Sequence, residues 1–255
     1  MMVVVASTLL VDLSSSWTNA TVKGNWFDQI EFQDVRRPNL WYNPDDKLVY
    51  RWGGWSYFYS LSYPSSFWSF ESFDNGSVTW QPAPDFTVNG LGADTYAPFG
   101  GASVATEDAF YSLGGSNTSY EIAVQGFVKY NFSTGQWSNS SSTAATSNGY
   151  LVQAQAAYVS NFGSSGFLAY VGGVVPDTQT YNPGSYDVVN LADMSIITLY
   201  DLASDTWYHQ QTTGDIPAAR SEFCMVGAPS QDKSYFDMYH SLTSSLHPPV
   251  HTDTC

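Results

Sequence analysis

The sequence is poor in charge, in basic residues, in cysteine and in long apolar runs, and each shortage excludes a class of protein. Charged residues make up 12% of the 255 residues, against about 25% in an average soluble domain. Eight Lys and Arg stand against 23 Asp and Glu, so the formal net charge is −15. Nucleic acids and anionic membranes need cationic surfaces, which argues against both partners. Two cysteines cannot make a disulfide-rich scaffold. No apolar run reaches the about 18 residues of a membrane-spanning helix, so the sequence predicts no membrane span.

Two sequence features bear on the cellular compartment of the protein, and they point in opposite directions. Residues 1–13 are apolar, but they lack a cationic beginning and contain Asp12, so we interpret them as a strand remnant rather than a signal peptide. Sequons for N-glycosylation point outward all the same, although a polar loop composition also produces them by chance. Five occur together, which favours an extracellular, cell-surface or lumenal domain: Asn19, Asn75, Asn117, Asn131 and Asn139.

Aromatic residues are abundant, at 16% of the chain, and many of them belong to a repeat. A hydrophobic run that ends in two glycines occurs three times, over residues 48–54, 109–115 and 167–173. After each, an aromatic residue precedes a Trp by seven positions; these aromatics are Phe73, Tyr130 and Tyr200. The repeated motif residues are Gly53, Gly54, Trp80, Gly114, Gly115, Trp137, Gly172, Gly173 and Trp207.

Each repeat is expected to hold four short strands. Gly, Pro, Asn and Ser interrupt the chain about every 8–12 residues and helical periodicity is nearly absent, which is typical of all-β structure. A four-stranded sheet cannot cover both of its faces, and radial packing of similar sheets covers them. The paired glycines allow positive φ or close backbone approach. The Trp and the aromatic before it supply apolar area between neighbouring sheets.

These repeats resemble the kelch repeats of β-propellers, in which four hydrophobic residues precede Gly-Gly and a spaced Tyr and Trp follow. The resemblance covers residues 9–239, and residues 196–220 are especially similar to secreted or membrane-anchored fungal kelch proteins, which are in turn similar to the propeller of galactose oxidase. It implies an all-β, kelch-type β-propeller of four-stranded antiparallel blades. Members of that group are generally binding or surface proteins, often with a C-terminal membrane span.

The two ends depart from the family pattern. Residues 9–17 match the last part of a unit, and the final unit lacks its Gly-Gly after residue 239. We therefore expect a partial ring over residues 1–239, with about three complete blades and partial blades at both ends, followed by an irregular tail at 240–255. The chain is then a fragment of a larger ring, or its first strand completes the last blade in a four-bladed ring. A partial ring exposes apolar edges and is expected to self-associate.

The residues needed for metal or redox chemistry are few. The resemblance to galactose oxidase implies two His ligands, a Tyr ligand and a Tyr–Cys crosslink, but His240, His247 and His251 lie in the tail and only His209 lies elsewhere. The spacing of His247, His251 and Cys255 allows a zinc site in principle, but Pro248 and Pro249 prevent the helix that would align them. Cys224 is interpreted as a small buried hydrophobe. The sequence predicts no catalytic residue, no metal and no cofactor.

Two insertions after diglycines are the best candidates for binding. In kelch-like blades these connections lie on one rim of the ring, and long loops on a rigid scaffold commonly carry binding residues. We predict a non-enzymatic interaction module that contacts a protein or carbohydrate partner through rim loops. The alternative is a fragment of a galactose oxidase-like carbohydrate oxidase that lacks its copper site. It also stays open that the aromatics only seal the blade interface. The candidate residues are Trp55, Tyr57, Tyr59, Asp177, Tyr181, Tyr186 and Asp187.

Overall fold

The computed structural model describes residues 7–11, 16, 18, 20–22, 24–28, 37–54, 67–72, 78–83, 98–116, 122–179 and 190–241. The regular elements of these residues are antiparallel β-strands, which confirms the all-β expectation. Within the same ranges there is no helix of the length and apolarity needed to cross a membrane.

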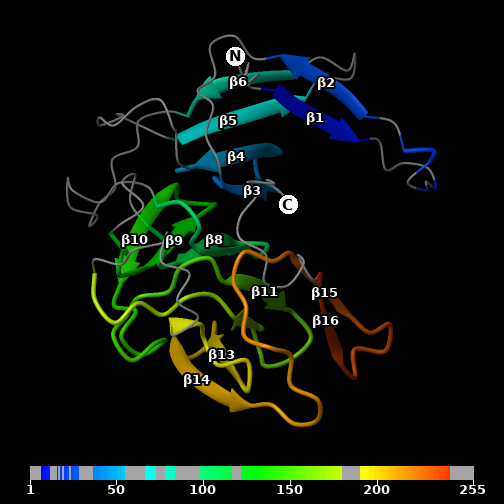
Figure 1. The fold of residues 1–255 in the computed structure, drawn as a ribbon. Coiled ribbons are helices and arrows are strands. Elements are labelled where there is room, and N and C mark those ends of the chain that lie inside the picture. The colour runs from blue at the N-terminus through cyan, green and yellow to red at the C-terminus, as the bar shows by residue number, and fades with distance from the viewer. Residues whose placement is uncertain are drawn as a thin grey trace, which may run out of the picture.

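Three antiparallel sheets of four strands form the body of the protein (Figure 1). The first blade contains β3 (Asn39–Asn43), β4 (Leu48–Trp52), β5 (Phe67–Ser72) and β6 (Val78–Pro82). The second contains β7 (Ala102–Ala105), β8 (Ala109–Leu113), β9 (Phe127–Asn131) and β10 (Gln136–Ser140). The third contains β11 (Gln155–Val159), β12 (Phe167–Val171), β13 (Ile196–Asp201) and β14 (Thr206–Gln211). In each blade the strands are adjacent in chain order, as successive hairpins require.

The first strands of successive sheets lie side by side. Strand β3 contacts β7, β7 contacts β11, and β11 contacts β15 (Met225–Pro229), the first strand of a final hairpin. The later strands of each sheet therefore extend outward from a common inner row. This arrangement fits the blades of a β-propeller, which pack face to face around an axis.

The second and third diglycines connect their blades to the chain that follows. The Gly115 N–H donates to the Leu151 carbonyl oxygen at 2.7 Å, and the Gly173 N–H donates to the Arg220 carbonyl oxygen at 2.8 Å. Gly114 and Gly172 have φ values of 65° and 64°. A methyl group on Gly114 would overlap the Leu151 carbonyl oxygen. Glycine is therefore required at Gly114 both for its backbone angle and for the space it leaves.

Aromatic rings fill the interface between the first and second blades. Trp41 is 4% exposed and stacks on Phe110 of the second blade, with ring centroids 4.0 Å apart. Tyr50 and Phe67 stack on the first-blade side, and Trp137 completes the cluster edge-on. Because large aromatic side chains bury about 150–250 Å² each, this interface holds the first two blades together.

The Trp of each repeat lies opposite an aromatic residue of the neighbouring strand. Tyr130 is the register partner of Trp137, and Tyr200 is that of Trp207. In the first blade the partner of Trp80 is Phe70, with ring centroids 5.0 Å apart. Spacing alone pointed to Phe73 instead. Strand β5 ends at Ser72, so that position falls in the connection before β6 and outside the described residues.

Hairpins stand before and after the three blades. Strand β1 (Ser7–Val11) pairs with β2 (Gly24–Asp28), and β15 pairs with β16 (Phe236–His240). In the part of the chain that the structure describes, β1 does not pair with β16, as completion of the last blade by the first strand would require. Strand β16 continues through His240, which the sequence placed in the tail, and residues 242–255 lie outside the described ranges.

Substitution of Gly114 tests the connection between blades. We expect Gly114→Ala to lower the free energy of unfolding by more than about 3 kcal/mol, because strain at positive φ adds to the clash with Leu151. Gly135→Ala is the matched control, since Gly135 has φ 63° but its nearest contact would be Tyr130 Oη at 3.9 Å. The free energy of unfolding of that variant is expected to fall by only about 1–2 kcal/mol, which is the cost of the backbone strain. Equal losses in urea denaturation would contradict the inter-blade contact.

Apolar side chains are exposed on the outward faces of the first blade and of the final hairpin. Val226 and Tyr239 are cross-strand neighbours and are 64% and 61% exposed. On the first blade, Leu40 and Tyr42 are 56% and 52% exposed. Met238 lies on the other face of the hairpin and packs toward the third blade. Each end of the row of blades thus has an apolar face that is open to solvent.

We expect these faces to drive self-association. In sedimentation velocity the protein should show a weight-average mass that increases with concentration, because burial of such faces is favourable. Val226→Thr combined with Tyr239→Thr should weaken the association and leave the melting temperature nearly unchanged, since both side chains are exposed. A sharp monomer peak with cooperative melting at all concentrations would contradict this expectation.

Candidate functional site

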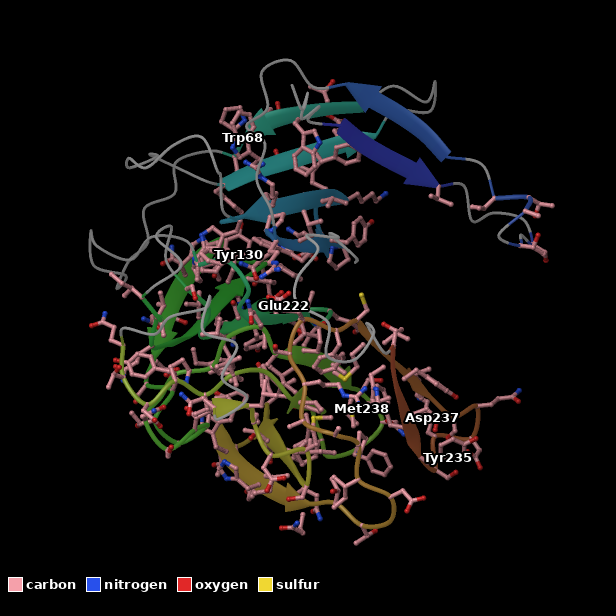
Figure 2. All side chains as sticks on the ribbon, in the orientation of Figure 1. Trp68, Tyr130, Glu222, Tyr235, Asp237 and Met238 are labelled. Atoms are coloured by element: carbon pink, nitrogen blue, oxygen red, sulfur yellow. The ribbon has the colours of Figure 1, made fainter. Side chains whose placement is uncertain are left out.

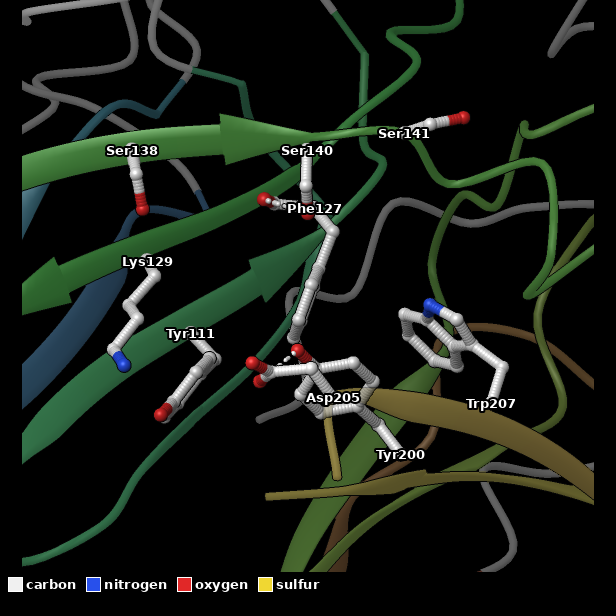
Figure 3. A pocket seen from close by; sticks show the side chains of 9 residues that line it. All are labelled: Tyr111, Phe127, Lys129, Ser138, Ser140, Ser141, Tyr200, Asp205 and Trp207. Carbon is white, nitrogen blue, oxygen red and sulfur yellow. Dashed lines mark hydrogen bonds between the residues drawn. The ribbon is translucent and has the colours of Figure 1, made fainter. Parts of the chain in front are cut away.

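A cleft of about 460 Å³ lies between the second and third blades (Figure 3). The second blade contributes Tyr111, Phe127 and Lys129, together with a short series of serines. The third blade contributes Tyr200, Asp205 and Trp207. The volume lies within the about 300–1,000 Å³ that is usual for small-molecule sites.

The cleft lies in an interface that lacks one bulky side chain of the first interface. In the first blade Trp41 is the register partner of Tyr50, and in the second blade Val104 is the register partner of Tyr111. Val104 therefore occupies the position equivalent to Trp41. It is half-buried, whereas Trp41 is almost fully buried. Trp207 of the cleft is half-buried, whereas the equivalent Trp137, which meets Trp41 edge-on, is 4% exposed.

The second-blade wall is a row of cross-strand neighbours. Tyr111 pairs with Lys129, and Lys129 pairs with Ser138. The Lys129 ammonium lies 5.5 Å from the centroid of the Tyr111 ring, where the ring quadrupole attracts a cation. The first-blade residue in the same register position is Ser69, which is 2% exposed. Lys129 forms no ion pair with any described residue. A single basic group thus lines an otherwise neutral strand face.

The third-blade wall combines rings with a carboxylate. The Tyr200 hydroxyl donates a hydrogen bond of 2.7 Å to Asp205 Oδ1. Trp207 packs beside Tyr200 with centroids 4.8 Å apart, and Phe127 of the second blade meets both rings edge-on. Figure 3 shows Ser138 and Lys129 pointing from the second blade toward this wall. The hydrogen bond fixes the Tyr200 ring and leaves the second carboxylate oxygen of Asp205 available to other donors.

A buried hydroxyl without a partner lies behind these rings. Tyr170 is 2% exposed, and its hydroxyl has no hydrogen-bond partner among the described residues. Its ring centroid is 5.7 Å from that of Trp207 and 6.5 Å from that of Phe127. Burial raises the pKa of Tyr170 well above its usual value, so the group stays neutral. A buried hydroxyl that lacks a partner carries a desolvation cost, and a hydroxyl that enters nearby would remove it.

Side chains of distant segments also meet where the first strands begin. Arg37 forms a two-point ion pair with Glu222, at 2.9 Å for both nitrogen–oxygen contacts, and Gln153 donates to Glu222 Oε1 at 2.6 Å. All three residues have positive φ, of 52°, 58° and 55° for Arg37, Gln153 and Glu222. Figure 2 shows Glu222 near the middle of the molecule. The ion pair is 39% and 47% exposed, so its contribution to stability is small.

Of the predicted rim-loop residues, the structure describes Asp177. It is exposed, in the connection that follows Gly173. The base of this connection is held against the second blade, because the Asn148 amide donates to the Pro176 carbonyl oxygen and the Ala123 N–H donates to that of Gln179. The other predicted residues lie outside the described ranges: Trp55, Tyr57, Tyr59, Tyr181, Tyr186 and Asp187.

Two of the five sequons lie in described residues. Asn131 ends β9, and its Oδ1 accepts hydrogen bonds from Ser133 and Thr134, so it also shapes the turn before β10. Asn139 is exposed on β10, with its amide against Gly126. Their glycosylation stays a prediction. The remaining three, Asn19, Asn75 and Asn117, lie outside the described ranges.

One interpretation from the sequence is corrected by the cysteines. Cys224 is disulfide-bonded and half-buried, so it is not a small buried hydrophobe. The residue type had suggested burial, and a position at the edge of the final hairpin overrides that tendency. Among the residues that the structure describes, no three His, Cys, Asp or Glu side chains lie close enough together to hold a metal ion.

Comparison with known proteins adds no assignment: no protein-family model matches the chain, and no curated protein matches it either.

The cleft residues were missed by motif reasoning because none of them belongs to a motif, apart from Trp207 and Tyr200. The signal that could have found the site is the difference between equivalent positions of two repeats. Val104 stands where the first blade has Trp41, and Lys129 stands where it has Ser69. A smaller residue and a charged residue on either side of Tyr111 indicate that one interface is packed differently from the other.

The tyrosines of the cleft predict a loss of stability at high pH. Burial, and then the carboxylates Asp205 and Asp108, raise the pKa of Tyr111 to about 12, above the about 10 of an unfolded chain. The folded state therefore holds this proton more tightly than the unfolded state. We expect the free energy of unfolding to be constant below pH 10 and to fall as the pH rises toward 12.

Urea denaturation between pH 8 and pH 11.5 checks this expectation. Tyr111→Phe should make the decline with pH shallower than in the wild type, because one of the linked protons is then absent. An unchanged slope in that variant would show that Tyr111 is not among the tyrosines that the folded state protects.

Proposed function

We propose that the chain is a kelch-type β-propeller and acts as a non-enzymatic interaction module, which contacts a protein or glycan partner through loops on one rim. Its kelch character is supported by the resemblance of the repeats and by the geometry of the diglycines. In two successive blades the second glycine donates to a carbonyl oxygen that precedes the next blade. No feature of the described residues favours the oxidase alternative.

The observation that carries the binding role is the anchored base of the loop after Gly173. Asn148 and Ala123 of the second blade's rim bind its backbone, while residues 177–179 are exposed. The described base of the loop is thus held to the scaffold, while its exposed residues 177–179 are open to a partner. Preorganisation of this kind lowers the entropy that a binding loop loses on association.

We also propose an extracellular or cell-surface location in a fungus-like source. The disulfide of Cys224 supports an oxidising compartment, because thiols are kept reduced in the cytosol. The exposed sequon at Asn139 is in keeping with the same location.

Substitution of the rim aromatics tests the binding role. Trp55→Ala, Tyr181→Ala and Tyr186→Ala are expected to abolish binding on a glycan array or an array of extracellular proteins, without lowering the melting temperature. Trp137→Ala is the control for a core residue, and it should lower the melting temperature because a 4% exposed indole is removed. Parallel loss of binding and of thermal stability in the rim variants would show instead that these aromatics seal a blade interface.

A further inference from the structure

We propose that the cleft between the second and third blades is a binding site for a neutral pyranose sugar, alone or as a terminal unit of a glycan. The inference rests on the proposed binding function but concerns a different surface from the rim loops. Four observations support it: the shape of the cleft, its rings, its polar groups and its charge.

The shape follows from the vacant position of the repeat. The first interface is closed by Trp41 against Phe110, and the second has Val104 at the same register position. The space that is left has a volume of about 460 Å³, which is sufficient for one or two sugar rings.

The rings supply the apolar part of the site. Trp207 is the half-buried indole of the repeat, and its fully buried counterpart is Trp137. Tyr200 and Phe127 hold Trp207 from two sides, at centroid distances of 4.8 and 5.0 Å. An indole with a fixed orientation and a partly open surface can pack against the C–H face of a sugar ring.

The polar groups provide both donors and acceptors. Lys129 donates, Asp205 accepts through the oxygen that Tyr200 does not use, and Ser138 does either. The Ser138 hydroxyl forms no hydrogen bond with any described residue, while its backbone belongs to the β9–β10 ladder. Sugar hydroxyls both donate and accept, so one ring can satisfy groups of both kinds.

The charges favour a neutral ligand. An anionic sugar would gain from Lys129 but would meet Asp205 in the same cleft and a chain of net charge −15. A cationic ligand would meet Lys129. A ligand without charge forms charge-assisted hydrogen bonds with both groups and is repelled by neither.

The experiment measures binding of the methyl glycosides of glucose, galactose, mannose and N-acetylglucosamine to the wild-type protein. Saturation-transfer NMR reports contact, and quenching of tryptophan fluorescence gives the dissociation constant. Glucuronate at equal ionic strength is the charged comparison. We expect at least one neutral glycoside to bind, and glucuronate to bind at least tenfold more weakly than methyl glucoside if glucose is that sugar.

Two variants copy the closed interface of the first blade. Val104→Trp introduces the residue type that the first blade has at the equivalent position, Trp41. It should weaken sugar binding at least tenfold, while the melting temperature stays the same or rises. Lys129→Ser restores the residue found at Ser69, and because it removes a partly exposed side chain it tests the site even where Val104→Trp perturbs folding. Tyr42→Phe, on the outer face of the first blade, is the control and should bind as the wild type does.

The outcomes separate this inference from the proposed function. Failure of all four neutral glycosides to bind the wild-type protein would overturn the sugar site. Binding that persists in both Val104→Trp and Lys129→Ser would overturn it as well. If the rim variants at Trp55 and Tyr181 lose their partner on an array but still bind the glycoside, both proposals stand as separate sites. If the rim variants keep the partner, the rim proposal fails and the sugar site is unaffected.

Discussion

The hydrogen bond from the second glycine of the last two diglycines to the chain that begins the next blade is the contact on which the other features depend. The Gly115 and Gly173 N–H groups reach Leu151 and Arg220 because no side chain stands between the two backbones. This sets how closely successive sheets approach at their inner ends. Away from the diglycines, the distance between neighbouring sheets follows from the twist of the sheets. Side chains must fill the space between them.

Successive interfaces between the blades are packed by different side chains. Between the first and second blades, Trp41, Phe110 and Trp137 leave almost no exposed surface. Between the second and third blades, Val104 and Lys129 take equivalent positions, and a cleft remains. Repetition therefore builds the scaffold, and the departure from repetition creates the site. Packing that is complete at one interface allows the other to stay incomplete without loss of the fold.

The order and type of the strands could be predicted from the sequence, because the glycine pairs, the turns and the Trp recur with each blade. The partner of Trp80 could not be predicted in this way. Phe70 faces it, not Phe73, because the spacing differs from the seven residues of the other two blades. The cleft depends on which side chains oppose each other in register, and linear spacing does not show this across three strands. The pairing of Arg37 with Glu222 joins segments that are far apart in the chain, so spacing does not predict it.

The Arg37–Glu222 pair has a consequence for the order in which the molecule folds. Almost all other contacts join a blade to itself or to its neighbour, so each blade can form soon after its own residues leave the ribosome. The pair joins residues that are 185 positions apart. It can form only after three blades are synthesised, and its loop-closure entropy is then low because the blades between are already stacked. The contact therefore requires that the three blades between its two residues are already in place.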